Sequence, residues 1–212
     1  MQAVLFDLDG TLLNTLRDIR NSVNGALKEF GYPAITEDET RRFVGDGAYE
    51  LMRRAVPENG DVDGCFAAFE RIFAANDGGE TAPYEGAREC LAALKKRGIK
   101  LAVVTNKPQY ATEKLVEKFF PDTFDFVAGD SGLFPCKPDP TLARYCALSL
   151  RVPMGECVFV GDGETDVLTA KNAGMKGIAV LWGYRGREEL ERAGATDFAE
   201  NYSALEKMLA NA

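Results

Sequence analysis

Two aspartates, Asp7 and Asp9, follow the apolar segment 4–6 and stand directly before Gly10. Side chains two residues apart in a strand point to the same side, so the two carboxylates should reach one small volume where the chain bends. Close carboxylates repel each other and lose hydration, and a proton, a cation or a catalytic task must compensate them. Taken alone, the pattern fits a polar turn equally well, because Asp and Gly are common turn residues.

Polar residues also follow two later apolar segments. In open parallel sheets, ligands bind outside the carboxyl ends of the strands, so these residues should lie near Asp7 and Asp9. Four carboxylates then face one candidate cation, Lys137, and a divalent ion would reduce the excess negative charge. Oxygen ligation completed by water suits magnesium. The polar residues in question are Thr105, Asn106 and Lys107 after segment 99–104, and Asp162 and Asp166 after segment 157–160.

The composition is that of an ordinary globular protein, with 212 residues, 46% hydrophobic and 27% charged. The net charge of −8 disfavours nucleic acid and anionic membrane surfaces as main partners. No apolar run approaches the roughly 20 residues that a bilayer span needs, so we expect no membrane segment. Met1 and Gln2 lead directly into an apolar strand without a basic leader. We therefore expect a cytoplasmic location.

The chain contains no histidine, which excludes Ser-His-Asp and Cys-His catalysis and any histidine metal site. Its five cysteines are odd in number and form no Cys-x-x-Cys pair, which favours reduced thiols over disulfides or a zinc site. Any chemistry must therefore use carboxylates, lysine, hydroxyls and a hard cation.

Continuous apolar runs predict strands that are buried on both faces, as in a parallel sheet covered by helices. Helical patterns separate most of these runs, with Gly98 at the position of a C-terminal cap. Asp139 and Pro140 predict the N-cap and first residue of a helix that runs to Leu150. The fold class is therefore α/β, a Rossmann-like parallel sheet flanked by helices. The predicted strands are Ala3–Phe6, Ile99–Val104, Phe124–Val127, Cys157–Val160 and Gly177–Leu181.

The segment 14–82 separates the first two predicted strands by far more than one helix. Amphipathic patterns predict that it is an all-helical cap domain inserted into the α/β core, which comprises residues 1–13 and 83–212. The turn-rich stretches Asn14-Thr15 and Asp77-Gly78-Gly79 at its ends favour a mobile cap. The alternative is a fixed helical subdomain that only enlarges the core.

These motifs together resemble those of the haloacid dehalogenase-like superfamily of phosphotransferases, and the resemblance covers almost the whole chain. The resemblance depends on the order of the motifs, because Thr105 alone is better explained as a helix-capping hydroxyl and Lys137 alone as a solvated loop lysine. The matching residues are Asp7-x-Asp9-x-Thr11, Thr105, Lys137, and Gly161-Asp162 with Asp166 four residues later.

The resemblance implies a role for each residue. Asp7 would be the nucleophile that forms an aspartyl-phosphate, and Asp9 the general acid and base. Thr105 and Lys137 would hold the phosphate oxygens, with Thr11 and Asn106 as further phosphate-binding candidates. Magnesium would bind Asp7, the Asp9 main-chain carbonyl and Asp162. Asp166 would act on the metal through water, or orient Asp162 and Lys137.

The segment 42–48 resembles the cap loop of phosphoglycolate phosphatase-type members, and Gly45 and Gly47 would allow a small substrate to approach the backbone. A plain turn between helices explains the two glycines equally well. Arg42, Arg53 and Arg54 are candidates for a substrate carboxylate, although helical arginines are more often solvated. Asn14 departs from the family pattern, in which many members carry aspartate there.

We therefore expect a magnesium-dependent phosphatase that hydrolyses a small phosphorylated metabolite, with 2-phosphoglycolate as the leading candidate. The presence of Asp9 favours hydrolysis of the intermediate, or its transfer to a sugar as in β-phosphoglucomutase. A third possibility is a non-enzymatic aspartate phospho-acceptor, which the first-strand position of Asp7 disfavours. The protein should be a monomer or a homodimer.

Overall fold

The computed structural model describes residues 1–211 and contains a six-stranded sheet in which every neighbouring pair of strands is parallel. The strand order is β5-β4-β1-β6-β7-β8. Strand β1 lies in the centre, and the chain builds outward first on one side of it and then on the other, which creates a crevice at its carboxyl end. The strands are β1 (Ala3–Phe6), β4 (Lys100–Pro108), β5 (Phe126–Asp130), β6 (Cys157–Gly161), β7 (Lys176–Val180) and β8 (Phe198–Ala199).

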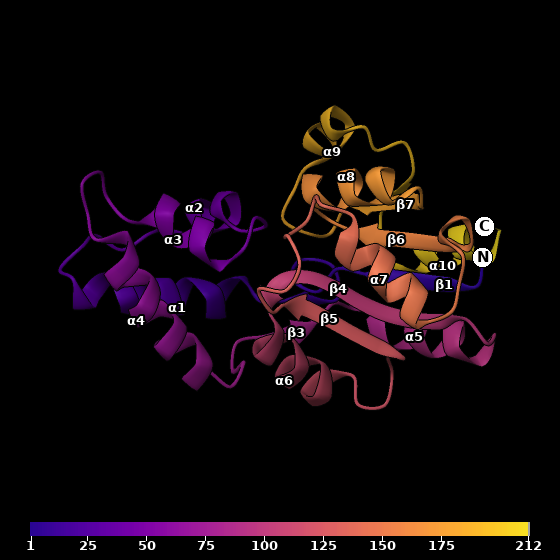
Figure 1. The fold of residues 1–212 in the computed structure, drawn as a ribbon, viewed down its shortest axis with the longest axis horizontal. Helices are drawn as coiled ribbons and strands as arrows, with labels where there is room; N and C mark the ends of the chain where they lie inside the picture. Colours follow the sequence, from indigo (N-terminus) through magenta and orange to yellow (C-terminus); the bar gives the residue numbers. More distant parts are fainter. Residues whose placement is uncertain (212) are drawn as a thin grey trace.

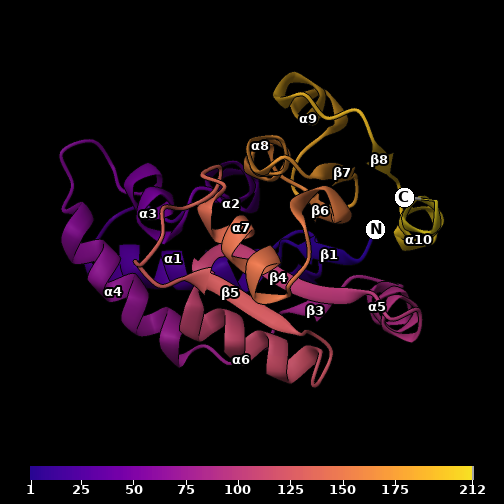
Figure 2. The ribbon, with the colours of Figure 1, turned by 45° about the vertical axis from the view of Figure 1, so that its right-hand side comes forward.

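Helices cover both faces of this sheet, and successive residues of β1 enter opposite cores. Val4 and Phe6 pack with α5, α6 and α10, whereas Ala3 and Leu5 pack with α7 and α8 (Figures 1 and 2). The continuous apolar runs of the sequence therefore serve two separate hydrophobic layers. The helices of this part are α5 (Ala87–Lys96), α6 (Gln109–Phe119), α7 (Thr141–Ser149), α8 (Glu164–Ala173), α9 (Arg187–Ala193) and α10 (Tyr202–Ala210), with a short 3₁₀ helix at Met154–Glu156.

The cap lies beside the carboxyl ends of the strands (Figure 1), and its helices form a hydrophobic cluster that Ala111 and Tyr184 of the α/β core also join. The short strands β2 (Leu13–Asn14) and β3 (Ala82–Pro83) pair antiparallel where the chain enters and leaves the cap. This pair stands at the predicted domain boundary, and we propose that it is the hinge. The cap helices are α1 (Leu16–Glu29), α2 (Glu37–Phe43), α3 (Ala48–Ala55) and α4 (Val62–Ala75).

The α/β fold class and all five predicted strands are confirmed; β1 has the predicted bounds, and the bounds of the other four shift. Strand β4 extends to Pro108 and β5 begins at Phe126, two residues later than predicted. The helix predicted to begin at Pro140 begins at Thr141 instead, with Pro140 as the N-cap. Gly98 follows α5 with φ of +76° and donates to the Lys95 carbonyl, as a C-terminal glycine should.

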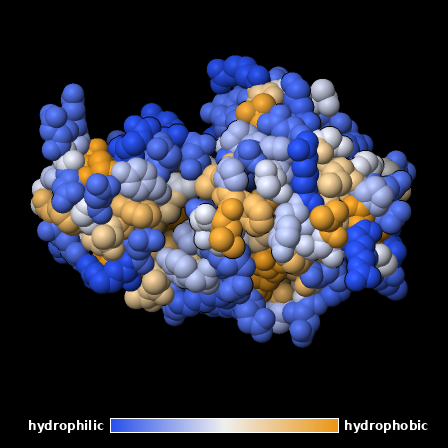
Figure 3. All heavy atoms as spheres, viewed as in Figure 1, coloured by the Kyte–Doolittle hydropathy of each residue, from blue (hydrophilic) through white to orange (hydrophobic). Residues whose placement is uncertain are grey.

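The face shown in Figure 3 is mainly hydrophilic, with small separate hydrophobic patches. Within residues 1–211, no helix combines the length and the apolar character that a membrane crossing requires. The five cysteines are all unpaired, and four of them are buried.

Candidate active site

The predicted site begins where β1 ends, and a glycine turn brings it against β6. Asp7 follows β1 directly, and its Oδ1 accepts a hydrogen bond from the Leu8 amide at 2.7 Å. Gly10 has φ of +82°, and a Cβ atom there would lie 2.2 Å from Oδ2 of Asp162. Only glycine allows the turn to approach the Asp162 carboxylate this closely.

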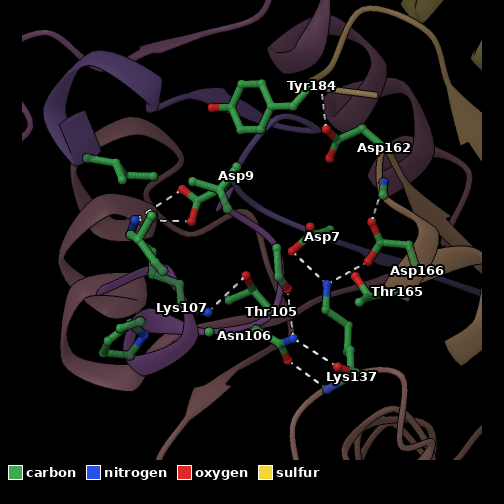
Figure 4. Close-up of a pocket in the computed structure, with 18 of the residues that line it drawn as sticks. Asp7, Asp9, Thr105, Asn106, Lys107, Lys137, Asp162, Thr165, Asp166 and Tyr184 are labelled. Atoms are coloured by element: carbon green, nitrogen blue, oxygen red, sulfur yellow. Dashed lines mark hydrogen bonds and ion pairs between the residues drawn. The ribbon is translucent and has the colours of Figure 1, made fainter. Parts of the chain in front are cut away.

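Three of the four predicted carboxylates converge. One oxygen from each of Asp7, Asp162 and Asp166 lies within 4.8 Å of the others, and all three side chains are at least largely buried (Figure 4). Carboxylate oxygens at this spacing, partly screened from bulk water, fit a hard divalent cation. The residues present thus have the chemistry that the predicted magnesium ion requires.

Lys137 holds two members of this carboxylate cluster together. Its Nζ lies 2.6 Å from Oδ1 of Asp166 and 2.9 Å from Oδ1 of Asp7, and its side chain is 1% exposed. The second Asp166 oxygen accepts from the Gly163 amide at 2.9 Å. Asp166 is therefore held by Lys137 on one oxygen and by the Gly163 amide on the other, and it fixes the position of the Lys137 ammonium.

The close packing of these buried charged groups shifts the pKa values of Asp7, Asp162 and Lys137. Burial, together with the nearby Asp166 carboxylate, raises the pKa of Asp7 to about 6. Burial and the charges of Asp166 and Asp7 raise the pKa of Asp162 to about 8. Burial acts to lower the pKa of Lys137, but Asp166 and Asp7 outweigh it, so that pKa is raised and the lysine stays charged. The site therefore favours added positive charge.

Asp162→Asn should stabilise the metal-free protein strongly at pH 8.5 and change it little at pH 4. A carboxyl with pKa of about 8 when folded and about 3.9 when unfolded binds its proton more tightly in the folded state. Its stabilising contribution is full below pH 4 and is lost as the pH rises toward 8. Asparagine resembles the neutral acid at every pH. Melting temperatures in chelator test this; an equal shift at both pH values would contradict it.

Asp9 lies beside the carboxylate cluster, but its side chain is turned away from it. Lys107 Nζ lies 3.1 Å from both Asp9 carboxylate oxygens, and Thr15 Oγ1 donates to one of them at 2.6 Å (Figure 4). The Lys107 side chain is 3% exposed and lies over the ring of Phe73. The site therefore contains a second buried lysine, where the sequence suggested Lys137 alone. For metal binding by Asp9, the main-chain carbonyl remains as the predicted ligand.

Thr11 contacts the carboxylate cluster through Asp162 and does not line the pocket. Its hydroxyl donates to Oδ1 of Asp162 at 3.0 Å, and the Tyr184 amide donates to Oδ2 at 2.7 Å. The Thr11 carbonyl accepts from Trp182 Nε1 and from the Tyr202 hydroxyl. Thr11 thus orients Asp162, and this position gives no support to its predicted contact with phosphate.

Thr105 and Asn106 stand at the end of β4, at the pocket wall. Thr105 Oγ1 accepts from the Lys107 amide at 3.3 Å, and its side chain is buried. The Asn106 amide group is occupied by the main chain, because it bonds the Lys137 carbonyl and amide and donates to the Gly45 carbonyl at 2.9 Å. Asn106 therefore fixes Lys137 and touches the cap loop. Gly45 and Gly47 both line the pocket, as predicted for a substrate-facing loop.

Arg185 joins the core to the same cap loop. Its guanidinium donates to the carbonyls of Arg41 and of Val44, the latter at 2.7 Å, while its Nε pairs with Glu164 at 2.9 Å. These carbonyls lie at the C-terminal end of α2, which favours a positive charge. Arg185 therefore clamps the cap against the core.

Arg185→Met should raise KM about tenfold and lower kcat less, because two charged hydrogen bonds that favour the closed cap are lost. Arg187→Met is the matched control, since Arg187 is 46% exposed, pairs with Glu191 at 3.7 Å, lies over the Phe198 ring and does not line the pocket. Steady-state kinetics of both variants test the clamp. Equal kinetics in the two variants would show that Arg185 does not control closure.

The pocket between cap and core measures about 680 Å³, including space open to solvent. Arg42, Arg53 and Arg54 are absent from its lining. Arg53 pairs with Glu50, and Arg54 pairs with Asp46 and the Phe43 carbonyl. The structure therefore gives no support to these arginines as partners of a substrate carboxylate.

The strand-end rule places Lys107 near Asp7 and Asp9, but the sequence assigns it no role. Tyr184 and Arg185 are site residues that the sequence analysis does not identify. Both follow β7, and the same rule applied to the carboxyl end of that strand would have indicated them. The Tyr184 hydroxyl lies 3.0 Å from the Thr15 amide and 3.1 Å from its hydroxyl, so it supports the residue that bonds Asp9.

Residues 4–180 match the model of the haloacid dehalogenase-like hydrolase family. A phosphoglycolate phosphatase of Pseudomonas fluorescens is 35% identical over 210 residues, which cover 95% of this chain and 77% of that protein. Much of the chain's length is thus shared with a curated phosphatase.

Solved structures of two bacterial proteins are also similar to this chain over nearly its whole length. A protein of Lactobacillus delbrueckii subsp. bulgaricus, provisionally described as a phosphoglycolate phosphatase, superposes with a TM-score of 0.92 at 31% identity and 98% coverage of both chains. A mutant of CbbY from Rhodobacter sphaeroides, in complex with xylulose-(1,5)bisphosphate, gives 0.81 at 27% identity, covering 96% and 95% of the chains.

The chain belongs to the haloacid dehalogenase-like hydrolase family. It is a phosphatase similar to phosphoglycolate phosphatases, and the expected enzyme class is confirmed. The alternative of a non-enzymatic phospho-acceptor is not retained, because the relatives that cover nearly the whole chain are hydrolases.

Proposed function

We propose that the protein is a magnesium-dependent phosphomonoesterase that works through an aspartyl-phosphate on Asp7. The observation that carries this is the position of Asp7 at the pocket wall, 2.9 Å from Lys137 and within the carboxylate cluster, with Asp9 two residues later. One Asp7 oxygen contacts Lys137, which leaves the other for attack.

In the first step an Asp7 oxygen forms a bond to phosphorus, and the bond from phosphorus to the alcohol oxygen breaks. Lys137 and the Thr105 hydroxyl stabilise the phosphate oxygens as charge spreads over them. Asp9 donates a proton to the departing alkoxide, then takes a proton from the water that attacks the aspartyl-phosphate. Thr15 and Lys107 hold the Asp9 carboxylate for this role.

For the metal, Asp7 and Asp162 would be the carboxylate ligands, with the Asp9 main-chain carbonyl as a third. A bound magnesium ion would supply positive charge to the phosphate oxygens and reduce repulsion among the carboxylates. Thr11 and the Tyr184 amide orient Asp162 for this purpose. Asp166 orients Lys137.

For the substrate we propose a small phosphorylated metabolite, with 2-phosphoglycolate as the first compound to assay because curated relatives carry that name. The sugar bisphosphate held by CbbY supports sugar phosphates as a second group. A mutase remains the alternative activity within that group.

The test is phosphate release from a panel of phosphorylated metabolites, with and without magnesium. We expect free phosphate in magnesium, none after chelation, and recovery when magnesium is restored. Turnover that survives exhaustive chelation would contradict the metal role, and a sugar phosphate isomer without free phosphate would indicate a mutase.

A further inference from the structure

The cap side of the pocket is apolar. Within the described residues, each cap residue that lines the pocket is a hydrocarbon side chain or a glycine. Phe69 and Phe73 stack with their ring centroids 5.0 Å apart and form part of this wall. A leaving group under the closed cap therefore meets no polar side chain on that side. The lining cap residues are Ile19, Val44, Gly45, Gly47, Ala48, Leu51, Phe69 and Phe73.

The three cationic side chains of the pocket come from the core, and each already has anionic or carbonyl partners. Lys137 contacts Asp7 and Asp166, while Lys107 contacts both oxygens of Asp9. Arg185 contacts Glu164 and two cap carbonyls, and its side chain is 12% exposed. A substrate carboxylate would have to share one of these cations with the carboxylate or carbonyl groups that the cation already contacts.

The net charge of the site also disfavours a substrate with a second anionic group. Four carboxylates face Lys107 and Lys137, and the proposed divalent ion would bring the site close to neutral before a phosphate binds. The phosphate dianion then adds negative charge, and a second anionic group would add more beside charged side chains that are themselves largely buried. An uncharged leaving group avoids this cost and gains contact with the apolar wall.

We infer that the site prefers phosphomonoesters of uncharged alcohols with a hydrocarbon portion over esters that carry a second anionic group, including 2-phosphoglycolate. This inference rests on the proposed phosphatase function. It assigns the choice of leaving group to the apolar cap wall, defined by the eight cap residues named above.

Isobutyl phosphate and 2-phosphoglycolate make a matched pair, because their leaving groups have the same number of heavy atoms and differ in charge. We expect kcat/KM to be about tenfold or more higher for isobutyl phosphate, with magnesium present. A higher kcat/KM for 2-phosphoglycolate would overturn the inference while leaving the phosphatase function intact. Turnover of neither ester, nor of any other phosphomonoester, would instead reject the proposed function.

A charge placed on the wall gives a second test. Ala48 lines the pocket at the first residue of α3 and is only partly buried, so Ala48→Lys can be accommodated. This variant should shift the ratio of the two kcat/KM values about tenfold toward 2-phosphoglycolate. Ala67→Lys, on the exposed face of α4, is the control and should leave the ratio unchanged. An unchanged ratio in the folded Ala48→Lys protein would contradict the role of the wall.

Discussion

Asp7→Asn is expected to lower phosphate release by about 10⁴-fold or more, since an amide oxygen cannot replace a carboxylate as a nucleophile toward phosphorus. The fold should persist, because asparagine keeps an oxygen that can accept from Lys137 and from the Leu8 amide. The variant also removes one charge from a crowded cluster, in which burial and neighbouring carboxylates raise the pKa of Asp7 to about 6.

Phosphate release and intact-protein mass spectrometry after mixing with substrate test this expectation. The wild type should carry a covalent phosphate during turnover, and the Asp7→Asn protein none. Asp197→Asn is the matched control, because Asp197 is 38% exposed and pairs loosely with Lys176 at 3.7 Å. Near-normal turnover by Asp7→Asn would remove Asp7 as the nucleophile.

The sheet and the main acidic residues could be predicted because each rests on local sequence. The segments 3–6 and 157–160 are continuously apolar, and a strand buried on both faces requires that pattern. Bounds were harder to predict because tertiary contacts fix them. The third strand was predicted to begin at Phe124, but Asp125 still lies before β5. Its amide donates to the Leu101 carbonyl, and its carboxylate accepts from the Leu101 amide on the neighbouring strand.

The partners of the acidic residues could not be read from the sequence, because they are set by contacts between distant segments. Lys107 is 98 positions from Asp9, and its paired state depends on how β4 ends beside β1. Arg185 lies 141 positions from Val44 and contacts it only when cap and core are close. A basic residue near a strand end indicates a site, whereas its partner follows from the fold.

Asp9→Asn is expected to slow turnover by about 10²- to 10⁴-fold, because the amide neither donates a proton to the leaving alkoxide nor accepts one from the attacking water. The nucleophile Asp7 is unchanged, so phosphoenzyme should still form and should then persist longer than in the wild type. Mass spectrometry over a time course measures this accumulation. Its absence, together with normal turnover, would exclude Asp9 as the acid and base.

The Asp9→Asn result needs a control for Lys107, since that variant leaves a lysine whose side chain is 3% exposed without its ionic partner. Lys107→Met removes the cation and retains the Asp9 carboxylate.

Substrates with different leaving groups distinguish loss of the Asp9 acid from the effect of an unpaired lysine. The p-nitrophenolate group departs without accepting a proton, whereas an alkoxide needs one. If Asp9 acts as the acid, Asp9→Asn should slow phosphoenzyme formation from an alkyl phosphate far more than from p-nitrophenyl phosphate. Lys107→Met should slow both to a similar extent. Equal slowing of the two substrates by Asp9→Asn would assign its effect to the unpaired lysine instead.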